Sequence, residues 1–384
     1  MTRKLYYEDC HMRDFTAFVT GCREGENGWE ITLDATAFYP EGGGQACDTG
    51  TLNGIRVKDV QERREEIVHL CEGPLGVGTS VNGCIDWERR FDLMQQHTGE
   101  HIVSGIIHRR YGYHNTGFHI GADVIQIDFD GVIPAADLPG IELEVNEAIW
   151  RNLKVECWYP SPEELPNTFY RTKRALPWPV RIVCVPGYDS CACCGVHVEH
   201  TGEIGLVKLF SVIGFRGGSR MELACGKRAL QMLNAAFDQN RVVSQAFSAK
   251  ITETGAAAQK MNEALAGEKF RANNLQRQLF GYIAESYVNY SNVLHFEENL
   301  EPALVRDLAD AIADRVSGMA AVFSGNEETG YSYCLVSRSE DLRSFGKAMN
   351  QSLSGRGGGK SNFQQGRVSA GKAAIEAFFR ERMG

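Results

Sequence analysis

The chain has 384 residues, of which 43% are hydrophobic and 23% are charged. This length exceeds one ordinary domain, so we expect two or three compact units, each with a core of its own. The net charge of −9 argues against a protein that binds nucleic acid through bulk positive charge, although a local basic surface is compatible with it. The N-terminal segment lacks the apolar core of a secretion signal, and no apolar stretch reaches membrane length, so we expect a soluble cytoplasmic protein.

Residues 1–88 are predicted to form a small β-barrel. Short stretches rich in β-branched and aromatic residues alternate with glycine-bearing turns, which is typical of the strands of a barrel. The predicted strands are Phe15–Cys22, Trp29–Asp34, Gly54–Val60 and Ile67–Cys71. Three consecutive glycines precede Gln45, and they permit positive φ angles and close approach of the backbone to a ligand.

Residues 89–226 are predicted to form an α+β domain. Apolar residues recur at helical spacing over Arg89–Tyr111, and a second helix is expected at Leu143–Asn152. Other stretches carry strand-forming residues, so strands and helices mix along this part of the sequence. The predicted strands are Val124–Phe129, Val155–Trp158, Arg181–Val185 and Ile204–Ser211.

The last part of the chain is predicted to contain long helices and then a small α/β domain. Within residues 227–300, two long helices interrupted near Thr252–Gly255 are expected to form a hairpin or a coiled coil, which makes this the predicted dimerisation segment. Residues 301–384 alternate helix and strand patterns, and Gly355–Gly359 is expected to be a loop. The fold class predicted for the whole chain is an α+β multidomain protein.

Four residues have the spacing of a zinc site. His97 and His101 stand four residues apart in a predicted helix, so both imidazoles can reach one metal ion. Cys193 and His197 flank a glycine-containing turn much later in the chain. Together the four residues supply three nitrogens and a thiolate, a set whose softness suits zinc.

Two points about this site stay open in the sequence. Cys191 and Cys194 are neighbouring thiols that could replace Cys193 as a ligand. Four protein ligands usually make a closed structural site, whereas a hydrolytic zinc needs a water molecule. The sequence therefore leaves four- and five-coordinate zinc as alternatives during catalysis.

Glu100 raises an alternative function. His97, Glu100 and His101 match the His-x-x-Glu-His pattern of a class of zinc peptidases, in which the glutamate activates water. Such enzymes use a distant carboxylate as the third ligand, whereas this chain offers a cysteine and a histidine. Glu100 is therefore interpreted as a carboxylate beside the site, on the helix surface or bonded to a ligand.

Motifs in three separate segments agree in order with those of a known family. They are Phe38-Tyr-Pro-Glu-Gly-Gly-Gly-Gln45 with Asp48-Thr-Gly50, His97-x-x-x-His101, and Cys193-x-x-x-His197 followed by Thr201-Gly-Glu-Ile-Gly205. Residues 1–228 resemble the editing domain of alanyl-tRNA synthetase and its free-standing relatives, the AlaX proteins. The C-terminal part resembles the DHHA1-like domain that accompanies DHH-type phosphoesterases and alanyl-tRNA synthetase, which is the organisation of the long AlaX class.

The resemblance implies a trans-editing hydrolase that deacylates mischarged Ser-tRNA(Ala), with Gly-tRNA(Ala) as a second candidate substrate, by means of a zinc-bound water. It implies a zinc ion held by His97, His101, Cys193 and His197. It implies a substrate pocket lined by Thr36, Gly43, Gly44 and Gln45. The basic residues predicted to contact alanine tRNA are Arg174, Arg220, Arg356 and Lys360. A homodimer is expected, and a non-catalytic, zinc-stabilised tRNA-binding module is the other alternative.

Overall fold

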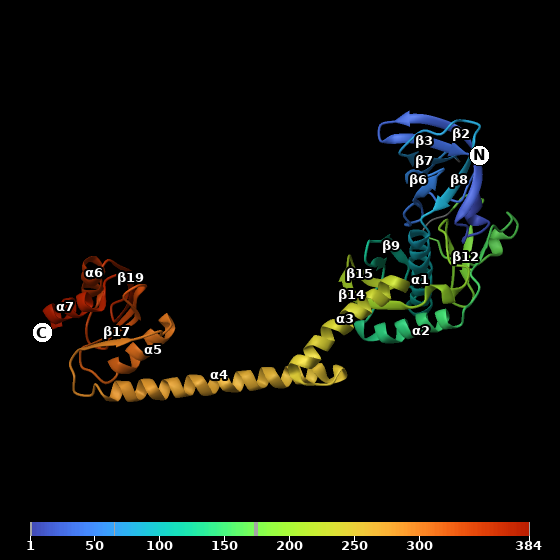
Figure 1. Cartoon of the computed structure of the whole chain (residues 1–384). Helices are drawn as coiled ribbons and strands as arrows, with labels where there is room; N and C mark the ends of the chain where they lie inside the picture. Colours follow the sequence, from blue (N-terminus) through green and yellow to red (C-terminus); the bar gives the residue numbers. More distant parts are fainter. Residues whose placement is uncertain (1, 65, 173–175, 384) are drawn as a thin grey trace. The chain divides into compact units, whose positions relative to one another are not determined.

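The chain contains both helices and strands, which are labelled in Figure 1. The structure is a computed structural model, and it describes residues 2–64, 66–172 and 176–383. Its internal contacts divide the chain into two compact units, Met1–Val242 and Val243–Gly384, so the mixed α+β organisation in more than one unit is confirmed. The finer boundaries predicted after residues 88, 226 and 300 stay predictions. Among the described residues, no helix is both long and apolar enough to cross a membrane.

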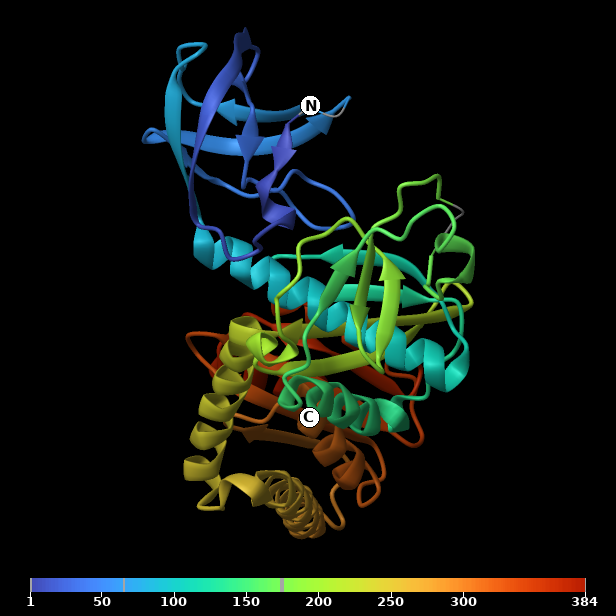
Figure 2. The same cartoon turned by 90° about the vertical axis from the view of Figure 1, so that its right-hand side faces the viewer.

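Six strands near the N-terminus form a closed barrel in the order β2-β3-β7-β6-β5-β8 (Figure 2). The strands are β2 (Asp14–Gly25), β3 (Gly28–Leu33), β5 (Gly50–Leu52), β6 (Ile55–Arg63), β7 (Glu66–Cys71) and β8 (Ser80–Ile85). Buried and exposed side chains alternate along β8, because successive residues of a strand point to opposite faces. A short parallel pair, β1 (Arg3–Lys4) with β4 (Ala35–Thr36), and the 3₁₀ helix η1 (Leu5–Tyr7) complete this part.

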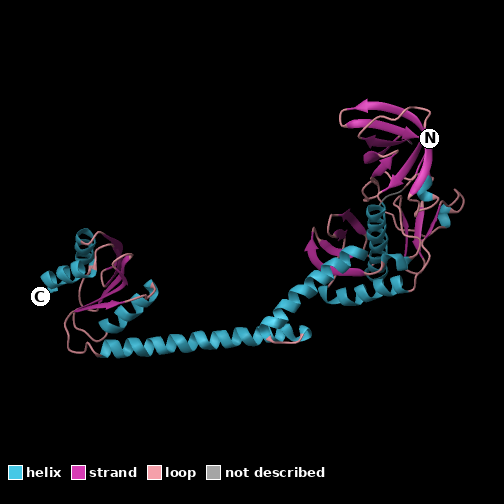
Figure 3. Ribbon diagram, viewed as in Figure 1, coloured by secondary structure: helices cyan, strands magenta, loops and turns pink. Residues whose placement is uncertain are grey.

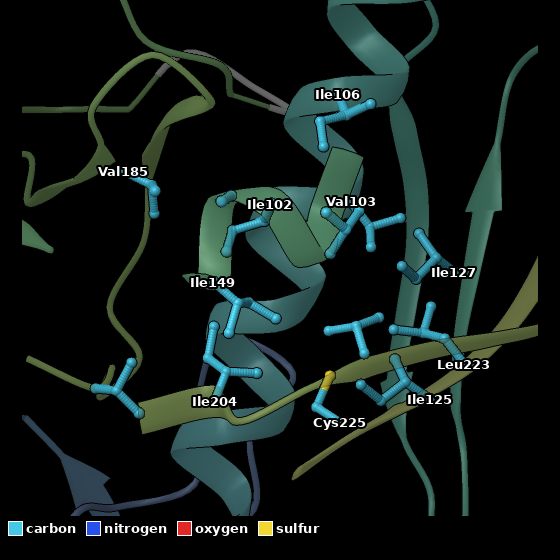
Figure 4. Close-up of a cluster of buried hydrophobic side chains, with 14 of the residues drawn as sticks. Ile102, Val103, Ile106, Ile125, Ile127, Ile149, Val185, Ile204, Leu223 and Cys225 are labelled. Atoms are coloured by element: carbon cyan, nitrogen blue, oxygen red, sulfur yellow. The ribbon is translucent and has the colours of Figure 1, made fainter. Parts of the chain in front are cut away.

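Helix α1 (Trp87–Tyr111) forms the centre of the next part of the first unit. It is buried from Leu93 to Ile107, because two sheets and the helix α2 (Leu138–Trp150) pack around it. Ile102, Val103 and Ile106 of α1 lie among the buried side chains of this core (Figure 4). Fully burying one such side chain contributes about 1.5–3 kcal/mol, so the helix is held firmly in place.

The two sheets around α1 differ in size. The larger is antiparallel in the order β14-β15-β10-β9, and the smaller has the order β11-β12-β13. Their strands are β9 (Asn115–Ile120), β10 (Ile125–Phe129), β11 (Glu156–Trp158), β12 (Ile182–Val185), β13 (Asp189–Ala192), β14 (Val207–Phe215) and β15 (Gly218–Cys225). The 3₁₀ helices of this part are η2 (Ala135–Asp137), η3 (Leu165–Asn167) and η4 (Thr201–Ile204).

A buried ion pair ties α1 to the glycine-rich segment of the barrel. The Arg90 and Asp48 side chains are both fully buried, and the Arg90 Nε lies 2.9 Å from the Asp48 Oδ1. The other carboxylate oxygen of Asp48 accepts a hydrogen bond from the Tyr39 backbone N–H at 2.6 Å. The Asp48-Thr-Gly50 motif therefore fixes the start of α1 against the loop that carries Gln45.

The second unit contains one sheet with helices on both faces (Figure 3). The sheet has the order β16-β17-β18-β20-β19, with β16 and β17 parallel and the other pairs antiparallel. The strands are β16 (Val293–Glu297), β17 (Met319–Asn326), β18 (Gly330–Ser337), β19 (Gly355–Lys360) and β20 (Phe363–Val368). Helices α6 (Arg343–Ser352) and α7 (Lys372–Met383) cover one face, while α5 (Pro302–Ala313) and the end of α4 (Thr254–Glu285) cover the other. Helix α3 (Gly226–Phe247) and the 3₁₀ helix η5 (Ile251–Glu253) precede α4, so the helices are interrupted close to the predicted place.

The glycine-rich stretch near the C-terminus differs from the expectation of a loop. Gly355–Gly359 belongs to strand β19, which pairs with β20 in an antiparallel hairpin. A Cβ atom on Gly357 would lie 2.4 Å from the Tyr333 hydroxyl, and one on Gly359 would lie 2.2 Å from the Phe363 carbonyl oxygen. Glycine is therefore required by the close approach of neighbouring groups, and a single sequence does not distinguish this requirement from a flexible loop.

Candidate functional site

Four side chains from two segments converge inside the first unit. His97 and His101 lie one turn apart on α1, and Cys193 and His197 lie in the segment between β13 and η4. The three histidines are almost completely buried. One possible ligand atom from each of the four residues lies within 4.8 Å of all the others. The structure therefore brings together the four residues that the sequence predicted as zinc ligands.

Two pairs of donor atoms have the separation that a tetrahedral zinc ion requires. Nitrogen and sulfur ligands bound to zinc at about 2.1 and 2.3 Å lie roughly 3.6 Å apart. The Cys193 Sγ lies 3.4 Å from the His97 Nε2 and 3.5 Å from the His197 Nε2. Three imidazole nitrogens and one thiolate thus suit a zinc ion in their chemistry, and the thiolate has the matching distance to two of the nitrogens.

Each histidine is oriented by a partner at its other ring nitrogen. The His101 Nδ1 donates to the Asp189 Oδ2 at 3.0 Å, and a carboxylate oxygen can only accept. The His197 Nδ1 lies 3.2 Å from the Thr98 Oγ1, which donates its own proton to the Met94 carbonyl oxygen and therefore accepts from His197. Protonation at Nδ1 leaves Nε2 free to bind a metal, as is usual for metal-binding histidines.

Gln45 is the partner that orients His97. Its Oε1 accepts from the His97 Nδ1 at 2.8 Å and from the Val196 backbone N–H at 3.2 Å. The glycine-rich loop of the barrel therefore joins α1 to the Cys193–His197 segment. Gly195 permits this approach, because a Cβ atom there would lie 2.2 Å from the His97 ring.

The Cys193–His197 segment is anchored through its backbone carbonyls. The Arg181 guanidinium donates to the carbonyl oxygens of Cys193 and Gly195 at 3.0 and 2.8 Å. The Tyr7 hydroxyl donates to the Cys194 carbonyl oxygen at 2.6 Å, and its ring lies under the Arg181 guanidinium at 4.4 Å. These contacts hold the turn so that the Cys193 thiol points toward the histidines.

The three neighbouring thiols have different environments. Burial alone would raise the pKa of Cys193, but the His97 and His101 imidazoles hold it well below its usual range, which favours the thiolate. Burial raises the pKa of Cys191 to about 11, and burial likewise raises the pKa of Cys194. Cys191 groups only with His101 and Asp189, and within the described parts of the chain Cys194 belongs to no such group. These environments favour Cys193 as the thiolate ligand.

A cavity of about 750 Å³ opens beside the four residues. His97, His101 and Cys193 form part of its wall, together with the acidic Glu100 and the basic Arg171. The Arg171 Nε lies 2.6 Å from the Asp189 Oδ1, so one buried carboxylate contacts both this guanidinium and the His101 ring. A volume of this size accommodates a small-molecule ligand.

The predicted substrate residues fall in different places. Gly43 lines the cavity, whereas Thr36, Gly44 and Gln45 are absent from its described lining. Thr36 is fully buried, and its Oγ1 lies 2.9 Å from the His69 Nε2. Gly44 packs against Phe118, and Gln45 binds His97. Contact of these residues with a substrate stays a prediction.

The predicted RNA contacts have different surroundings. Arg174 lies outside the described residues, and Arg220 is paired with Asp128 at 2.7 Å. Arg356 and Lys360 lie on the exposed strand β19, and Arg356 lines a hollow of about 550 Å³ with Arg343 and Lys347. Their contact with RNA stays a prediction.

We expect the substitution Asp189→Asn to weaken zinc binding about 10- to 100-fold, because loss of a partner that orients a metal-binding histidine has an effect of this size. The substitution removes the acceptor charge that the His101 ring and the Arg171 guanidinium share. The zinc dissociation constant of the full-length protein, measured by competition with a chelating dye, checks this. The control is Asp137→Asn, whose carboxylate contacts the Tyr111 hydroxyl at 2.7 Å. An unchanged dissociation constant in Asp189→Asn would remove this role from Asp189.

Comparison with known proteins identifies relatives of the whole chain. Residues 2–89 match the family model tRNA synthetases class II (A), and residues 180–222 match the threonyl and alanyl tRNA synthetase second additional domain. The chain is 29% identical to the alanyl-tRNA editing protein AlaX-L of Pyrococcus horikoshii over 96% of this chain and 95% of the relative. It is 30% identical to the alanyl-tRNA editing protein Aarsd1 of Bos taurus over 73% of this chain and 67% of the relative. The chain belongs to the alanyl-tRNA editing protein family.

Relatives of this editing family include a ligase. The chain is 31% identical to the alanine–tRNA ligase of Thermofilum pendens over 98% of this chain, and it spans 44% of that protein. The similarity to AlaX-L and Aarsd1 confirms the predicted resemblance to free-standing editing proteins. The second matched domain contains Cys193 and His197, so half of the candidate zinc site lies in a region shared with the synthetases.

Asp189, Thr98 and Gln45 contact the histidines of the candidate site, and the sequence alone does not indicate these contacts. Gln45 was predicted as a substrate contact, and in the structure it orients His97. No local pattern in the sequence marks Asp189 or Thr98, because each meets its histidine across a long separation in sequence. The general rule that a metal-binding histidine needs an acceptor for its second ring nitrogen predicts that such partners exist, but it does not identify them in the sequence.

Proposed function

We propose that this protein is a trans-editing hydrolase that deacylates mischarged Ser-tRNA(Ala), with Gly-tRNA(Ala) as a second substrate. The observation that carries the proposal is the buried group of three histidines and a cysteine at the wall of a cavity, in a chain of the alanyl-tRNA editing protein family. The relatives' names specify editing of alanyl-tRNA, and the site supplies groups suited to ester hydrolysis.

In this proposal His97, His101, Cys193 and His197 hold a zinc ion, which supplies a Lewis acid able to polarise a carbonyl oxygen and to acidify water. Gln45, Asp189 and Thr98 keep the histidines in the tautomer that binds metal. The cavity, of about 750 Å³, would receive the aminoacyl end of the tRNA. An aminoacyl ester is already activated, so these residues need to bind and orient it more than to supply further acid catalysis.

Discrimination between serine and alanine requires polar groups that the serine hydroxyl satisfies. A site built to hydrogen-bond a hydroxyl rejects an analogue that lacks it, because its polar groups are then left without partners. Asn115 belongs to the cavity wall, and its Oδ1 is buried without a hydrogen-bond partner among the described residues. An unsatisfied polar atom of this kind supports a pocket that is completed by a polar substrate.

The test is a deacylation assay of the full-length protein on Ser-, Gly- and Ala-charged alanine tRNA, with a zinc measurement on the same sample. We expect hydrolysis of the first two esters, sparing of Ala-tRNA(Ala), and loss of activity on removal of zinc by a chelator. Binding of tRNA without turnover would favour the zinc-stabilised binding module instead. Cleavage of peptides in place of esters would favour the peptidase.

We also propose that the protein is a homodimer joined through α4. Six large apolar side chains on α4 are more than half exposed. Four of these form two pairs with the i,i+4 spacing that places residues on one helix face. They are Met261, Leu265, Leu275 and Leu279. An exposed apolar stripe of this kind is typical of a surface that binds another protein.

For this dimer we expect the double substitution Leu265→Glu/Leu279→Glu to halve the mass in solution. Charged side chains on the stripe would oppose its burial against a second copy. Light scattering coupled to size-exclusion chromatography should give twice 42.6 kDa for the unchanged chain and 42.6 kDa for the variant. The polar substitution Asn273→Glu is the control, and its mass should not change. A monomeric mass for the unchanged chain would refute the dimer.

A further inference from the structure

Glu100 is a buried carboxylate at the wall of the cavity that the proposed chemistry does not use. It lies on α1 between His97 and His101, and the i, i+3 and i+4 positions of a helix share one face. The side chain is 4% exposed and lines the cavity together with both histidines. Its position therefore puts a carboxylate next to the metal ligands, inside the space that would receive the substrate.

The carboxylate is held by two donors that both contact one of its oxygens. The Asn115 Nδ2 donates to the Glu100 Oε1 at 2.6 Å, and the Ser104 hydroxyl donates to the same oxygen. The other oxygen, Oε2, has no hydrogen-bond partner within the described parts of the chain. A carboxylate offers about four lone-pair sites, so this fixed group can still accept hydrogen bonds from a ligand.

The other charged groups of the cavity wall already have partners. Arg171 is paired with Asp189 at 2.6 Å, and His114 lies 3.1 Å from Asp130. No ion pair of Glu100 occurs among residues 2–64, 66–172 and 176–383. Arg171 is close enough to Glu100 for their charges to interact, but its hydrogen bond goes to Asp189. The second oxygen of Glu100 can therefore still accept a charge-assisted hydrogen bond from a cationic group of the ligand.

We propose that Glu100 binds the free α-ammonium group of the aminoacyl ester, an inference that rests on the proposed deacylase function. The ammonium group is attached to the carbon next to the ester carbonyl, so a carbonyl held at the His97/His101 face presents its ammonium to a neighbouring side chain on that face. Asn115 and Ser104 are positioning residues, because they fix the carboxylate by its Oε1. The subsite selects esters with a free amino group over N-blocked esters, and it acts on seryl and alanyl esters alike.

The experiment compares two esters that differ only in this group. Full-length, zinc-loaded protein is given Ser-tRNA(Ala) and glyceryl-tRNA(Ala), in which a hydroxyl replaces the amino group at nearly the same volume. In Glu100→Gln we expect kcat/KM to fall about 10- to 100-fold for the seryl ester and by less than about threefold for the glyceryl ester, since a hydrogen bond between charged groups has been weakened. The control is Glu88→Gln, on the exposed start of the same helix, with no change for either ester.

Binding gives a second readout that needs no turnover. The probes are 3′-(L-seryl)amino-3′-deoxyadenosine, whose amide bond is stable, and its glyceryl counterpart. By calorimetry, the unchanged protein should bind the seryl probe at least about tenfold more tightly, and Glu100→Gln should lose most of that preference while keeping its zinc. Equal binding of both probes by the unchanged protein overturns the proposal, whatever the variant does.

The outcomes distinguish failure of the ammonium subsite from failure of the proposed deacylase function. If Glu100→Gln slows both esters equally, Glu100 acts on the reaction itself, for example in proton transfer, and the ammonium subsite is wrong while the deacylase function stands. If the unchanged protein hydrolyses neither ester, the proposed deacylase function is wrong. Glu100→Asp keeps the charge and should retain part of the preference for the seryl ester.

Discussion

Replacing Cys193 with alanine is expected to remove zinc from the protein and to abolish deacylation of Ser-tRNA(Ala). The Cys193 thiolate is the sulfur ligand of the proposed zinc site, and the His97 and His197 Nε2 atoms lie 3.4 and 3.5 Å from its Sγ. Loss of a partner behind a ligand already reduces metal affinity or activity 10- to 100-fold, so loss of the ligand itself should reduce activity more than about 100-fold. The zinc content measured by metal analysis should fall from about one ion per chain to almost none.

The control for this substitution is Cys184→Ala, a partly buried thiol on β12 of the neighbouring sheet. It should keep its zinc and its activity. Cys191→Ala tests the remaining alternative, because Cys191 groups with His101 and Asp189. If Cys193→Ala kept zinc and activity while Cys191→Ala lost both, the ligand would be Cys191.

The substitution Asp48→Ala is expected to lower the free energy of unfolding by about 3–5 kcal/mol, because it leaves a buried guanidinium without its partner. Both side chains of the Asp48–Arg90 pair are fully buried, and Asp48 also accepts from the Tyr39 backbone. Urea unfolding followed by tryptophan fluorescence measures the change. Surface ion pairs contribute little, so Glu8→Ala, which breaks the exposed pair with Arg3, should leave stability unchanged.

A small effect of Asp48→Ala, similar to that of Glu8→Ala, would contradict this role of the buried pair. A large effect has a second consequence, because the same loop carries Gln45. Loosening the loop should also weaken the hold on the His97 ring and with it the affinity for zinc.

Much of the architecture was predictable because local patterns determine it. The predicted strand Ile67–Cys71 lies within β7, and the helix expected at Arg89–Tyr111 lies within α1, since alternation and helical periodicity report directly on which face is buried. The pairing of His97 with His101 was likewise readable from the i,i+4 spacing. The Cys-x-x-x-His segment added the other two candidate ligands.

The remaining features depend on contacts between distant residues. Gln45 reaches His97 across 52 positions, Asp189 reaches His101 across 88, and Thr98 reaches His197 across 99. No local spacing marks such partners in one sequence. The strand at Gly355–Gly359 cannot be predicted locally for a similar reason, because the closeness of Tyr333 that demands glycine is a property of the folded sheet.

The Gln45 amide couples the barrel loop to the candidate metal site. A single oxygen accepts from the His97 ring and from the Val196 backbone, so the docked loop and the metal-binding orientation of His97 stabilise each other. Linkage requires such an effect to be reciprocal. A metal ion that prefers the oriented ring must also protect the amides of the glycine-rich loop from hydrogen exchange, and a chelator must release that protection while the barrel itself stays folded.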